Sequence, residues 1–208
     1  ALIGVNDDRF ANAKPITCNA SCTTNSAAPV LAILHEALGI QKASMTTVHS
    51  YTATQKVVDG PDSKDLRRGR AAAVNIVPSS TGAAEAVIQV IPELKGKFDA
   101  VSVRVPSITG SLSIITALVN KSVSAQEINT LFANAAASPR WSKILYVTRD
   151  EIVSSDIIGE PYGAIIDASL TKVTDGNLVT VFSWYDNEYG YTATLIEHVR
   201  RITRTVLD

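Results

Sequence analysis

Apolar positions along this chain of 208 residues follow two spacings, one typical of strands and one typical of helices. Runs rich in β-branched and other apolar residues, bounded by turn residues, predict strands. We expect strands at 43–50, 100–106, 112–119, 144–147, 164–173 and 178–185. Asp175 and Gly176 lie between the last two runs, and an Asp-Gly pair between strands is a strong hairpin signal. These two strands should therefore be antiparallel.

Apolar residues at helical spacing predict two helices in the second half of the chain. Ser124 and Glu127 form a capping box at the start of the first, whose apolar face continues to Ala136. The second helix lies near the C-terminus, and His198 falls outside its apolar stripe. The stripe consists of Leu195, Val199, Ile202 and Val206.

Two more helices are expected in the first half. One covers about 81–91 and ends at Pro92. The other covers the apolar stretch 30–38 and ends at Gly39. Its start stays open, because Pro29 suits either a first helical residue or an internal kink. Strands, helices and an antiparallel hairpin together predict an α+β domain rather than a doubly wound one.

The composition indicates a folded protein without a strong net charge. It is 46% hydrophobic and 19% charged, which excludes disordered and fibrous classes. The 19 basic and 20 acidic residues leave a net charge of −1, so we expect no general attraction to nucleic acid or to an anionic membrane. No apolar run approaches the ~18 residues that a membrane-spanning helix needs.

Cysteine usage and the start of the chain indicate where the protein resides. The two cysteines, Cys18 and Cys22, are too few for a disulfide framework. Because the sequence also shows no secretory signal, we expect a reducing, cytoplasmic compartment.

Met45 is the only methionine and the chain opens with the apolar run 1–5, so we expect this sequence to be the interior of a longer polypeptide.

The most informative stretch surrounds Cys22. Small polar residues crowd this cysteine just before an apolar helical run, which places its sulfur near a helix N-terminus. Free amides and the helix dipole there favour the thiolate and lower the pKa of a thiol. The same amides can stabilise an oxyanion on a carbonyl that the sulfur attacks. The alternative is an inert, buried free cysteine.

Two other residues bear on this interpretation. Cys18 lies in a stretch that we expect to be a strand with no helix start to activate it, so we interpret it as structural. A metal site with a histidine has little support, since two cysteines four residues apart lack the second pair of a zinc motif. His49 ends a predicted strand, where it is suited to accept a proton from a thiol.

Three features are suited to bind anions. The segment 64–70 carries four positive charges, and such a run is usually a solvated loop. As a ligand contact, it suits a phosphate-bearing small substrate better than nucleic acid, because no aromatic residues are interleaved with it. A helix begins after Ser80, Thr81 and Gly82, which suits either a bound phosphate or ordinary capping. Arg104 interrupts an apolar strand and needs an anionic partner, either a structural carboxylate or a ligand.

A dinucleotide-binding fingerprint is absent. None of the 11 glycines belongs to a G-x-G-x-x-G or a G-x-x-x-x-G-K-[ST] sequence. From its residues alone, this chain therefore carries no recognisable nucleotide-binding loop.

Taken in order, these stretches resemble the catalytic domain of the phosphorylating glyceraldehyde-3-phosphate dehydrogenase family. The matching segments are A-S-C-T-T-N at 20–25, T-V-H-S-Y-T at 47–52, D-L-R-R at 65–68, S-T-G-A-A at 80–84, V-R-V-P at 103–106 and S-W-Y-D-N-E-Y-G-Y at 183–191. The resemblance implies an α+β fold with a mixed, largely antiparallel sheet covered by helices. It also implies that most of the N-terminal Rossmann domain is missing.

The resemblance assigns a role to each site residue. Cys22 would attack the aldehyde of glyceraldehyde 3-phosphate and His49 would act as base, giving a thiohemiacetal and then a thioester. Inorganic phosphate would cleave the thioester to 1,3-bisphosphoglycerate, and NAD or NADP would accept the hydride. The implied phosphate-binding residues are Thr52 and Arg104 for the substrate, and Ser21, Thr23, Thr81, Gly82 and nearby Arg68 for the attacking phosphate. The implied cofactor contacts are Asn187 and Tyr191.

The resemblance also implies an organisation of the longer protein. Residues 1–20 would be the tail end of the NAD-binding domain, 21–190 the catalytic domain, and 191–208 a helix that packs on the missing domain. The loop 51–74 would line a homotetramer interface. Two alternatives stay open: an erythrose-4-phosphate dehydrogenase, or a non-catalytic fragment that acts through oligomer or anion contacts.

Overall fold

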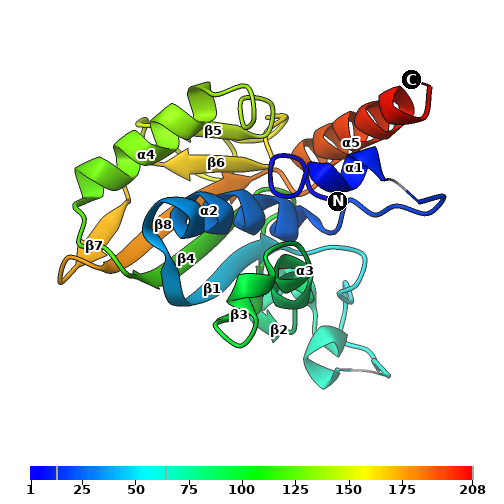
Figure 1. Cartoon of the computed structure of the whole chain (residues 1–208). Coiled ribbons are helices and arrows are strands. Elements are labelled where there is room, and N and C mark those ends of the chain that lie inside the picture. The colour runs from blue at the N-terminus through cyan, green and yellow to red at the C-terminus, as the bar shows by residue number, and fades with distance from the viewer. Residues whose placement is uncertain (13, 64, 208) are drawn as a thin grey trace.

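A mixed β-sheet organises the chain, and helices cover one of its faces, as the computed structural model shows (Figure 1). The structure describes residues 1–12, 14–63 and 65–207. Within them, eight strands form one sheet in the order β2-β3-β1-β4-β8-β6-β5, with β7 paired to β8. The strands are β1 Ile40–Ser50, β2 Val77–Ser79, β3 Phe98–Val105, β4 Ser111–Val119, β5 Leu145–Thr148, β6 Ala164–Asp167, β7 Lys172–Thr174 and β8 Leu178–Tyr185.

The pairing of the strands confirms the expected α+β fold. β1 runs parallel to β3, and β5 runs parallel to β6. The other pairs, such as β1 with β4 and β4 with β8, are antiparallel. β7 and β8 form the predicted hairpin, and both turn residues, Asp175 and Gly176, adopt the positive φ that such a turn requires.

Helix α2 forms the centre of the core. It lies across the sheet in Figure 1, and α3 and α4 flank it. The helices are α1 Asp8–Ala11, α2 Cys22–Leu38, α3 Ala83–Val90, α4 Ala125–Ala137 and α5 Tyr189–Leu207, with single 3₁₀ turns at Leu66–Gly69, Ala72–Val74 and Pro92–Leu94. Nearly every residue of α2 is buried, because both the sheet and the neighbouring helices enclose it.

The start of α2 shows whether Pro29 is the first residue of this helix or lies inside it. The helix begins at Cys22, so Pro29 is an interior residue. Proline has no N–H, so the carbonyl of Asn25 loses its helical hydrogen bond. The backbone at Gly163 packs closely against this unpaired carbonyl of Asn25, since a Cβ added to Gly163 would lie 3.3 Å from its oxygen.

The opposite face of the sheet has no helix on it among the described residues. In β4 the buried residues alternate with half-buried ones such as Leu112, Ile114 and Leu118. The half-buried set faces away from α2, together with Val101, which is 42% exposed. One face of the sheet thus carries the core, while the other presents apolar side chains to the surroundings.

Two expectations about elements are wrong, and two elements were missed. The run 164–173 is two strands, because the carboxylate of Asp167 accepts bonds from the N–H and hydroxyl of Ser169 and ends β6 there. The edge strand β2 and the four-residue helix α1 were not predicted. Cys18 lies in an irregular segment rather than a strand, and the neighbouring Ile16 is exposed.

The capping box and the C-terminal helix are confirmed. In the C-terminal helix, however, the buried face is not the predicted apolar stripe. Ser124 and Glu127 make both reciprocal bonds at the start of α4. In α5, His198 is buried and contacts the ring of Phe10 edge-on. In the predicted apolar stripe, Leu195 and Val199 are exposed and Ile202 packs partly on the core, whereas Val206 lies outside the residues whose side chains are described.

Candidate active site

The structure brings Cys22 and His49 together. Cys22 is the first residue of α2, and Ser21 caps this helix by accepting a hydrogen bond from the N–H of Thr24 at 3.1 Å. His49 is the penultimate residue of β1 and is almost fully buried. Its Nε2 lies 3.5 Å from the Sγ of Cys22. The helix start and the strand end that the sequence singled out therefore form one thiol–imidazole pair.

Burial decides the charge of this pair. It raises the pKa of the Cys22 thiol, although hydrogen bonds from the hydroxyl and N–H of Thr23 act in the opposite direction. Burial, and then the Arg104 guanidinium, lower the pKa of His49 to about 4. The amides of the helix N-terminus lower the pKa of Cys22 as expected, but burial is the larger cause, so the net shift is upward. At neutral pH the pair is a thiol beside a neutral imidazole.

Tyr185 lies beneath the pair, and the sequence analysis gave this residue no role. Its buried hydroxyl is 3.0 Å from the Oγ1 of Thr23 and 2.7 Å from the Oγ1 of Thr47. Its ring meets the imidazole of His49 edge-on, with 5.8 Å between the ring centroids. Strand alternation in 178–185 places this tyrosine on the buried face, where its hydroxyl needs partners. Tyr185 therefore joins the start of α2 to β1.

A pocket of about 360 Å³ opens over the sulfur. Its walls come from the start of α2, the end of β1, β3 and the start of α3. The lining residues are Ala20, Ser21, Cys22, Thr23, Thr24, His49, Ser80, Thr81, Gly82, Ala86 and Arg104. Of the predicted site residues, Thr52, Arg68, Asn187 and Tyr191 do not line this pocket.

Arg104 has no carboxylate partner among its recorded contacts. β3 pairs with β1 so that Arg104 lies opposite His49. Its Nη1 is 3.0 Å from the Nδ1 of His49, 3.1 Å from the carbonyl oxygen of Ser50 and 3.4 Å from the Oγ1 of Thr52. Its Nε is buried and, within the described part of the chain, has no hydrogen-bond partner. A half-buried cation in this state is suited to an anionic ligand.

The second predicted anion site lies at the start of α3. Arg68 donates from Nε to the Oγ of Ser79 at 3.2 Å and from Nη2 to the Oγ of Ser80 at 3.3 Å. Thr81 accepts a bond from the N–H of Ala83, while Gly82 is the N-cap residue and has no side chain to cap the helix. A Cβ added to Gly82 would meet nothing within 4 Å, so the space in front of this helix is open.

Of the predicted cofactor residues, Asn187 lies between β8 and α5, and Tyr191 lies in the first turn of α5. The Oδ1 of Asn187 accepts bonds from the Oγ of Ser50, the N–H of Gly110 and the Oγ of Ser111, at 2.9, 3.1 and 3.1 Å. Because the side-chain oxygen of Asn187 accepts all three of these bonds, its amide nitrogen remains available as a hydrogen-bond donor. Such a donor fits the carbonyl oxygen of a nicotinamide carboxamide. Tyr191 donates its hydroxyl to the carbonyl of Ala20 at 3.3 Å.

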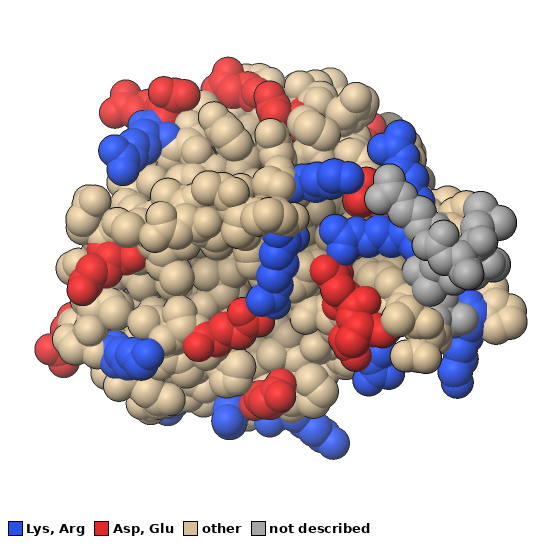
Figure 2. Space-filling view, turned by 45° about the horizontal axis from the view of Figure 1, so that its top comes forward, with Lys and Arg blue, Asp and Glu red and all other residues tan. Residues whose placement is uncertain are grey.

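The basic segment 64–70 does not form a continuous patch in the described residues. Arg70 pairs with Asp59 at 3.2 Å, and Arg68 is bound to the two serines above. Lys64, also part of this segment, lies outside the described residues. Basic and acidic side chains are interspersed over the face of the molecule in Figure 2.

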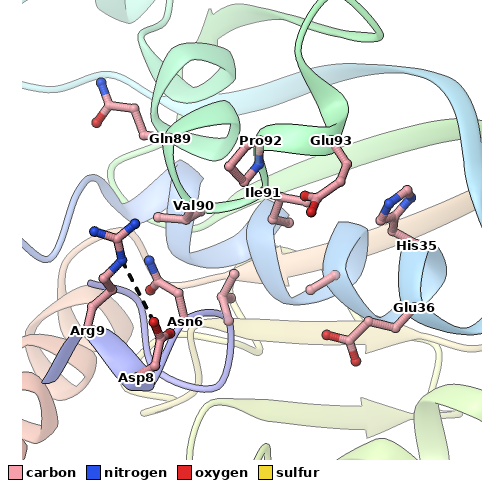
Figure 3. A pocket seen from close by; sticks show the side chains of 12 residues that line it. Asn6, Asp8, Arg9, His35, Glu36, Gln89, Val90, Ile91, Pro92 and Glu93 are labelled. Atoms are coloured by element: carbon pink, nitrogen blue, oxygen red, sulfur yellow. Dashed lines mark ion pairs between the residues drawn. The ribbon is translucent and has the colours of Figure 1, made fainter. Parts of the chain in front are cut away.

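Another hollow, of about 340 Å³, lies between α2, the end of α3 and the segment around α1 (Figure 3). Neither Cys22 nor His49 lines it. Three of its charged groups have partners in the chain, since Arg9 pairs with Asp8 and Glu36 binds Arg140. Among the described residues no cluster of three or more His, Cys, Asp or Glu side chains is arranged to hold a metal ion. None of the described helices has the length and apolarity to cross a bilayer.

The fold and the site define the class of protein. A family model described as glyceraldehyde 3-phosphate dehydrogenase, C-terminal domain, matches residues 21–187, and the chain belongs to this family. It is 47% identical to the glyceraldehyde-3-phosphate dehydrogenase of Monascus purpureus and 43% identical to glyceraldehyde-3-phosphate dehydrogenase 1 of Saccharomyces cerevisiae, each over 98% of this chain. It is 48% identical to the Mycobacterium avium enzyme over 99% of this chain. The chain spans about 60% of the length of these relatives.

Proposed function

We propose that this chain is the catalytic part of an enzyme that oxidises glyceraldehyde 3-phosphate to 1,3-bisphosphoglycerate with inorganic phosphate and NAD or NADP. The observation that carries the proposal is the thiol–imidazole pair, with 3.5 Å between Cys22 Sγ and His49 Nε2, in a pocket whose Arg104 lacks an acidic partner. A sulfur nucleophile with a base in reach suits covalent catalysis on an aldehyde.

The first step uses the pair itself. Sγ of Cys22 attacks the aldehyde carbon as its proton passes to Nε2 of His49, and a thiohemiacetal forms. The free amides at the start of α2 stabilise the developing oxyanion. A bound nicotinamide would accept the hydride from the thiohemiacetal carbon while the hydroxyl proton passes to His49, which leaves the thioester, and Asn187 and Tyr191 are suited to contact the nicotinamide.

Two sets of residues then position two phosphate groups. Thr52 and Arg104 bind the phosphate of the substrate. Inorganic phosphate is held by a second set and attacks the thioester, releasing the sulfur of Cys22. This second set consists of Ser21, Thr23, Thr81 and Gly82, with Arg68 close by. Two fixed phosphates on either side of one reacting carbon supply the orientation that such chemistry requires.

We also infer an assembly, most simply a homotetramer of the longer protein. The uncovered face of the sheet supports it, and so do apolar residues of the loop after β1, which are between 70% and 85% exposed. These loop residues are Val57, Val58, Leu66, Val74 and Ile76. Residues 1–20 are assigned to the end of the cofactor domain and 191–208 to a helix that packs on it. Two unpaired cysteines support a reducing, cytoplasmic location.

The attack of phosphate on the thioester can be run in reverse, which tests the proposed function without a nicotinamide. An acyl phosphate should transfer its acyl group to Cys22, and the mass of the peptide that contains Cys22 should rise by one acyl group. Cys22→Ser should abolish the modification, and His49→Asn should slow it. Cys18→Ser is the matched control and should retain it. Equal acylation of both cysteines, or none at Cys22, would contradict the proposal. In the longer protein, comparing the two phosphorylated aldehydes separates a glyceraldehyde 3-phosphate enzyme from an erythrose 4-phosphate enzyme.

A further inference from the structure

The residue two positions before Cys22 has an unusual backbone conformation. Ala20 has a φ of 55°, in the left-handed region that residues with a Cβ rarely adopt. For a residue other than glycine this conformation costs free energy, and it persists only where the surrounding structure enforces it. Ala20 also lines the pocket over the sulfur. Its conformation therefore sets the direction in which the chain enters α2.

Asn25 fixes the carbonyl groups on both sides of Ala20. Its Nδ2 donates one hydrogen bond to the carbonyl oxygen of Asn19 at 2.8 Å and another to the carbonyl oxygen of Ser21 at 3.0 Å. These two bonds use both protons of the side-chain amide. Asn25 belongs to α2 itself, so its bonds tie the segment before α2 to the helix that follows it.

The last helix, α5, contacts the same segment at three points. The three residues of α5 are spaced by three and four, so they share one face of that helix. The contacts are Tyr191 Oη to the carbonyl oxygen of Ala20 at 3.3 Å, Asn19 Nδ2 to Thr194 Oγ1 at 3.1 Å, and His198 Nε2 to Thr17 Oγ1 at 3.2 Å. One face of α5 thus follows the chain as it approaches Cys22.

The contact between Thr194 and Asn19 is buried on both sides, since the two residues are 1% and 3% exposed. The hydroxyl of Thr194 donates to the carbonyl oxygen of Tyr191 at 2.8 Å, so it accepts the bond from Asn19. The Oδ1 of Asn19 is buried and has no hydrogen-bond partner within the described part of the chain. Burying that oxygen costs free energy, so the contribution of the Asn19 side chain is its bond to Thr194.

We propose that Thr194 is a positioning residue for Cys22. Through Asn19 it holds Ala20 in the left-handed conformation, and this conformation places the sulfur of Cys22 beside Nε2 of His49. Without the bond, Ala20 relaxes to an ordinary negative φ, the peptide group that follows it turns, and the sulfur separates from its base. The proposal rests on the proposed function in one respect, since it takes the thiol–imidazole pair to be the reacting group.

The pH profile of alkylation distinguishes positioning from a role in stability alone. In the unmodified chain, the rate at which Cys22 reacts with iodoacetamide should fall little from pH 7 to about pH 5, because His49, with a pKa of about 4, can still accept the thiol proton. Thr194→Val removes the hydroxyl in a side chain of similar shape. Its Cys22 should react at least about tenfold more slowly at neutral pH. Its rate should also fall about tenfold for each further pH unit, as for an ordinary thiol below its pKa.

Two further substitutions in α5 serve as controls. Thr194→Ser keeps the hydroxyl and should restore both the rate and the profile. Thr203→Val is the matched control, because Thr203 is exposed and its hydroxyl bonds only to the carbonyl of Val199 in the same helix among its recorded contacts. This variant should behave like the unmodified chain. Thr194→Ala removes the same hydroxyl and replaces the valine variant in the test if that variant loses its native circular dichroism.

Glycine at position 20 tests the route from Thr194 to Cys22. Glycine adopts a positive φ without steric cost, so Ala20→Gly should make the site less dependent on the bond to Thr194. In this background, Thr194→Val should slow the alkylation of Cys22 no more than about threefold, against at least about tenfold with Ala20 in place. An equal loss in both backgrounds would overturn the proposal, because the hydroxyl would then not act through Ala20.

The outcomes separate this proposal from the proposed function. If Cys22 of the unmodified chain already has the profile of an ordinary thiol, the thiol–imidazole pair fails, and the positioning role fails with it. If the unmodified chain has the shallow profile and Thr194→Val keeps it, the pair survives and only the positioning role of Thr194 is refuted.

Discussion

Cys22 and Cys18 lie four residues apart in sequence and have very different surroundings. Cys22 opens the buried helix α2 and contacts the imidazole of His49. Cys18 is exposed in an irregular segment, where its Sγ accepts a bond from the N–H of Ala20 at 3.2 Å. The same thiol group thus occurs once inside the site and once at the surface.

The surroundings, and not the cysteine itself, therefore make the nucleophile. A base within reach, an adjacent cation and a hydroxyl network all converge on Cys22. The price is burial, which favours the neutral thiol over the thiolate. Cys22 therefore depends on proton transfer to His49 at the moment of attack, whereas Cys18 has no imidazole among its recorded contacts.

Removing the base should have the largest effect on this comparison. In phosphate buffer at neutral pH, His49→Asn should slow the alkylation of Cys22 on the order of a hundredfold, because the thiol loses its proton acceptor. The rate at Cys18 should stay the same in both proteins. Peptide mass spectrometry of a time course measures both rates in one sample. If the two cysteines react alike before and after the substitution, the pair does not function as the structure indicates.

Acid should destabilise the fold through the same histidine. The pKa of His49 is about 4 in the folded chain and 6.5 in the unfolded one, so between these values only the unfolded chain binds the proton. Stability is therefore complete above pH 6.5 and is lost as the pH falls towards 4, by about 3 kcal/mol in all. Urea unfolding at several pH values measures this, and His49→Asn should remove most of the dependence. Cys18→Ser should keep it, and a flat profile in the unmodified chain would argue against a neutral, buried His49.

Tyr185→Phe should weaken the connection between the two halves of the pair. The hydroxyls of Thr23 and Thr47 lose a buried hydrogen-bond partner, which costs about 1–3 kcal/mol of unfolding free energy. Cys22 should react a few-fold more slowly, with Cys18 unchanged. Tyr146→Phe is the matched control, since Tyr146 is half exposed and should tolerate the change. Equal stability of both variants would show that the hydroxyl is not part of the support.

Ser21→Ala should have the smallest effect. It removes the cap of α2 and should cost about 1 kcal/mol in urea unfolding. Ser124→Ala removes the cap of α4 and should cost a similar amount. Only the first should also lower the alkylation rate of Cys22. If both variants leave that rate intact, the position of the sulfur does not depend on its own helix cap.

Local signals predicted most of the fold. The capping box at Ser124 and the hairpin at Asp175 depend on neighbouring residues, and both are confirmed. The run 164–173 was misread because its interruption depends on Asp167, whose second carboxylate oxygen accepts a bond from Trp184 in β8. The edge strand β2 does not stand out in the sequence, because it is only three residues long and contains Pro78.

The candidate site was predictable as a set of residues but not as a geometry. A cysteine at a helix start, a histidine at a strand end and an arginine within an apolar strand follow from pattern, and the resemblance supplied their roles. The dominance of burial over the helix dipole at Cys22 depends on how completely the sheet and helices enclose it. The role of Tyr185 depends on two threonines from different elements. The degree of burial of Cys22 and the contacts of Tyr185 cannot be predicted from the sequence alone, because both arise from packing between distant segments.

The place of β8 in the sheet has a consequence for how the chain is made. This strand lies between β4 and β6, although it is the last strand to leave the ribosome. The bond between Thr23 and Tyr185 spans 162 residues of sequence. Contacts of such long range slow folding, so the earlier strands must wait, with their central edge unpaired, until nearly all of the chain has been synthesised. The support that Tyr185 gives to the start of α2 can therefore form only after β8 has been synthesised, and the reactivity of Cys22 can report on that late step of folding.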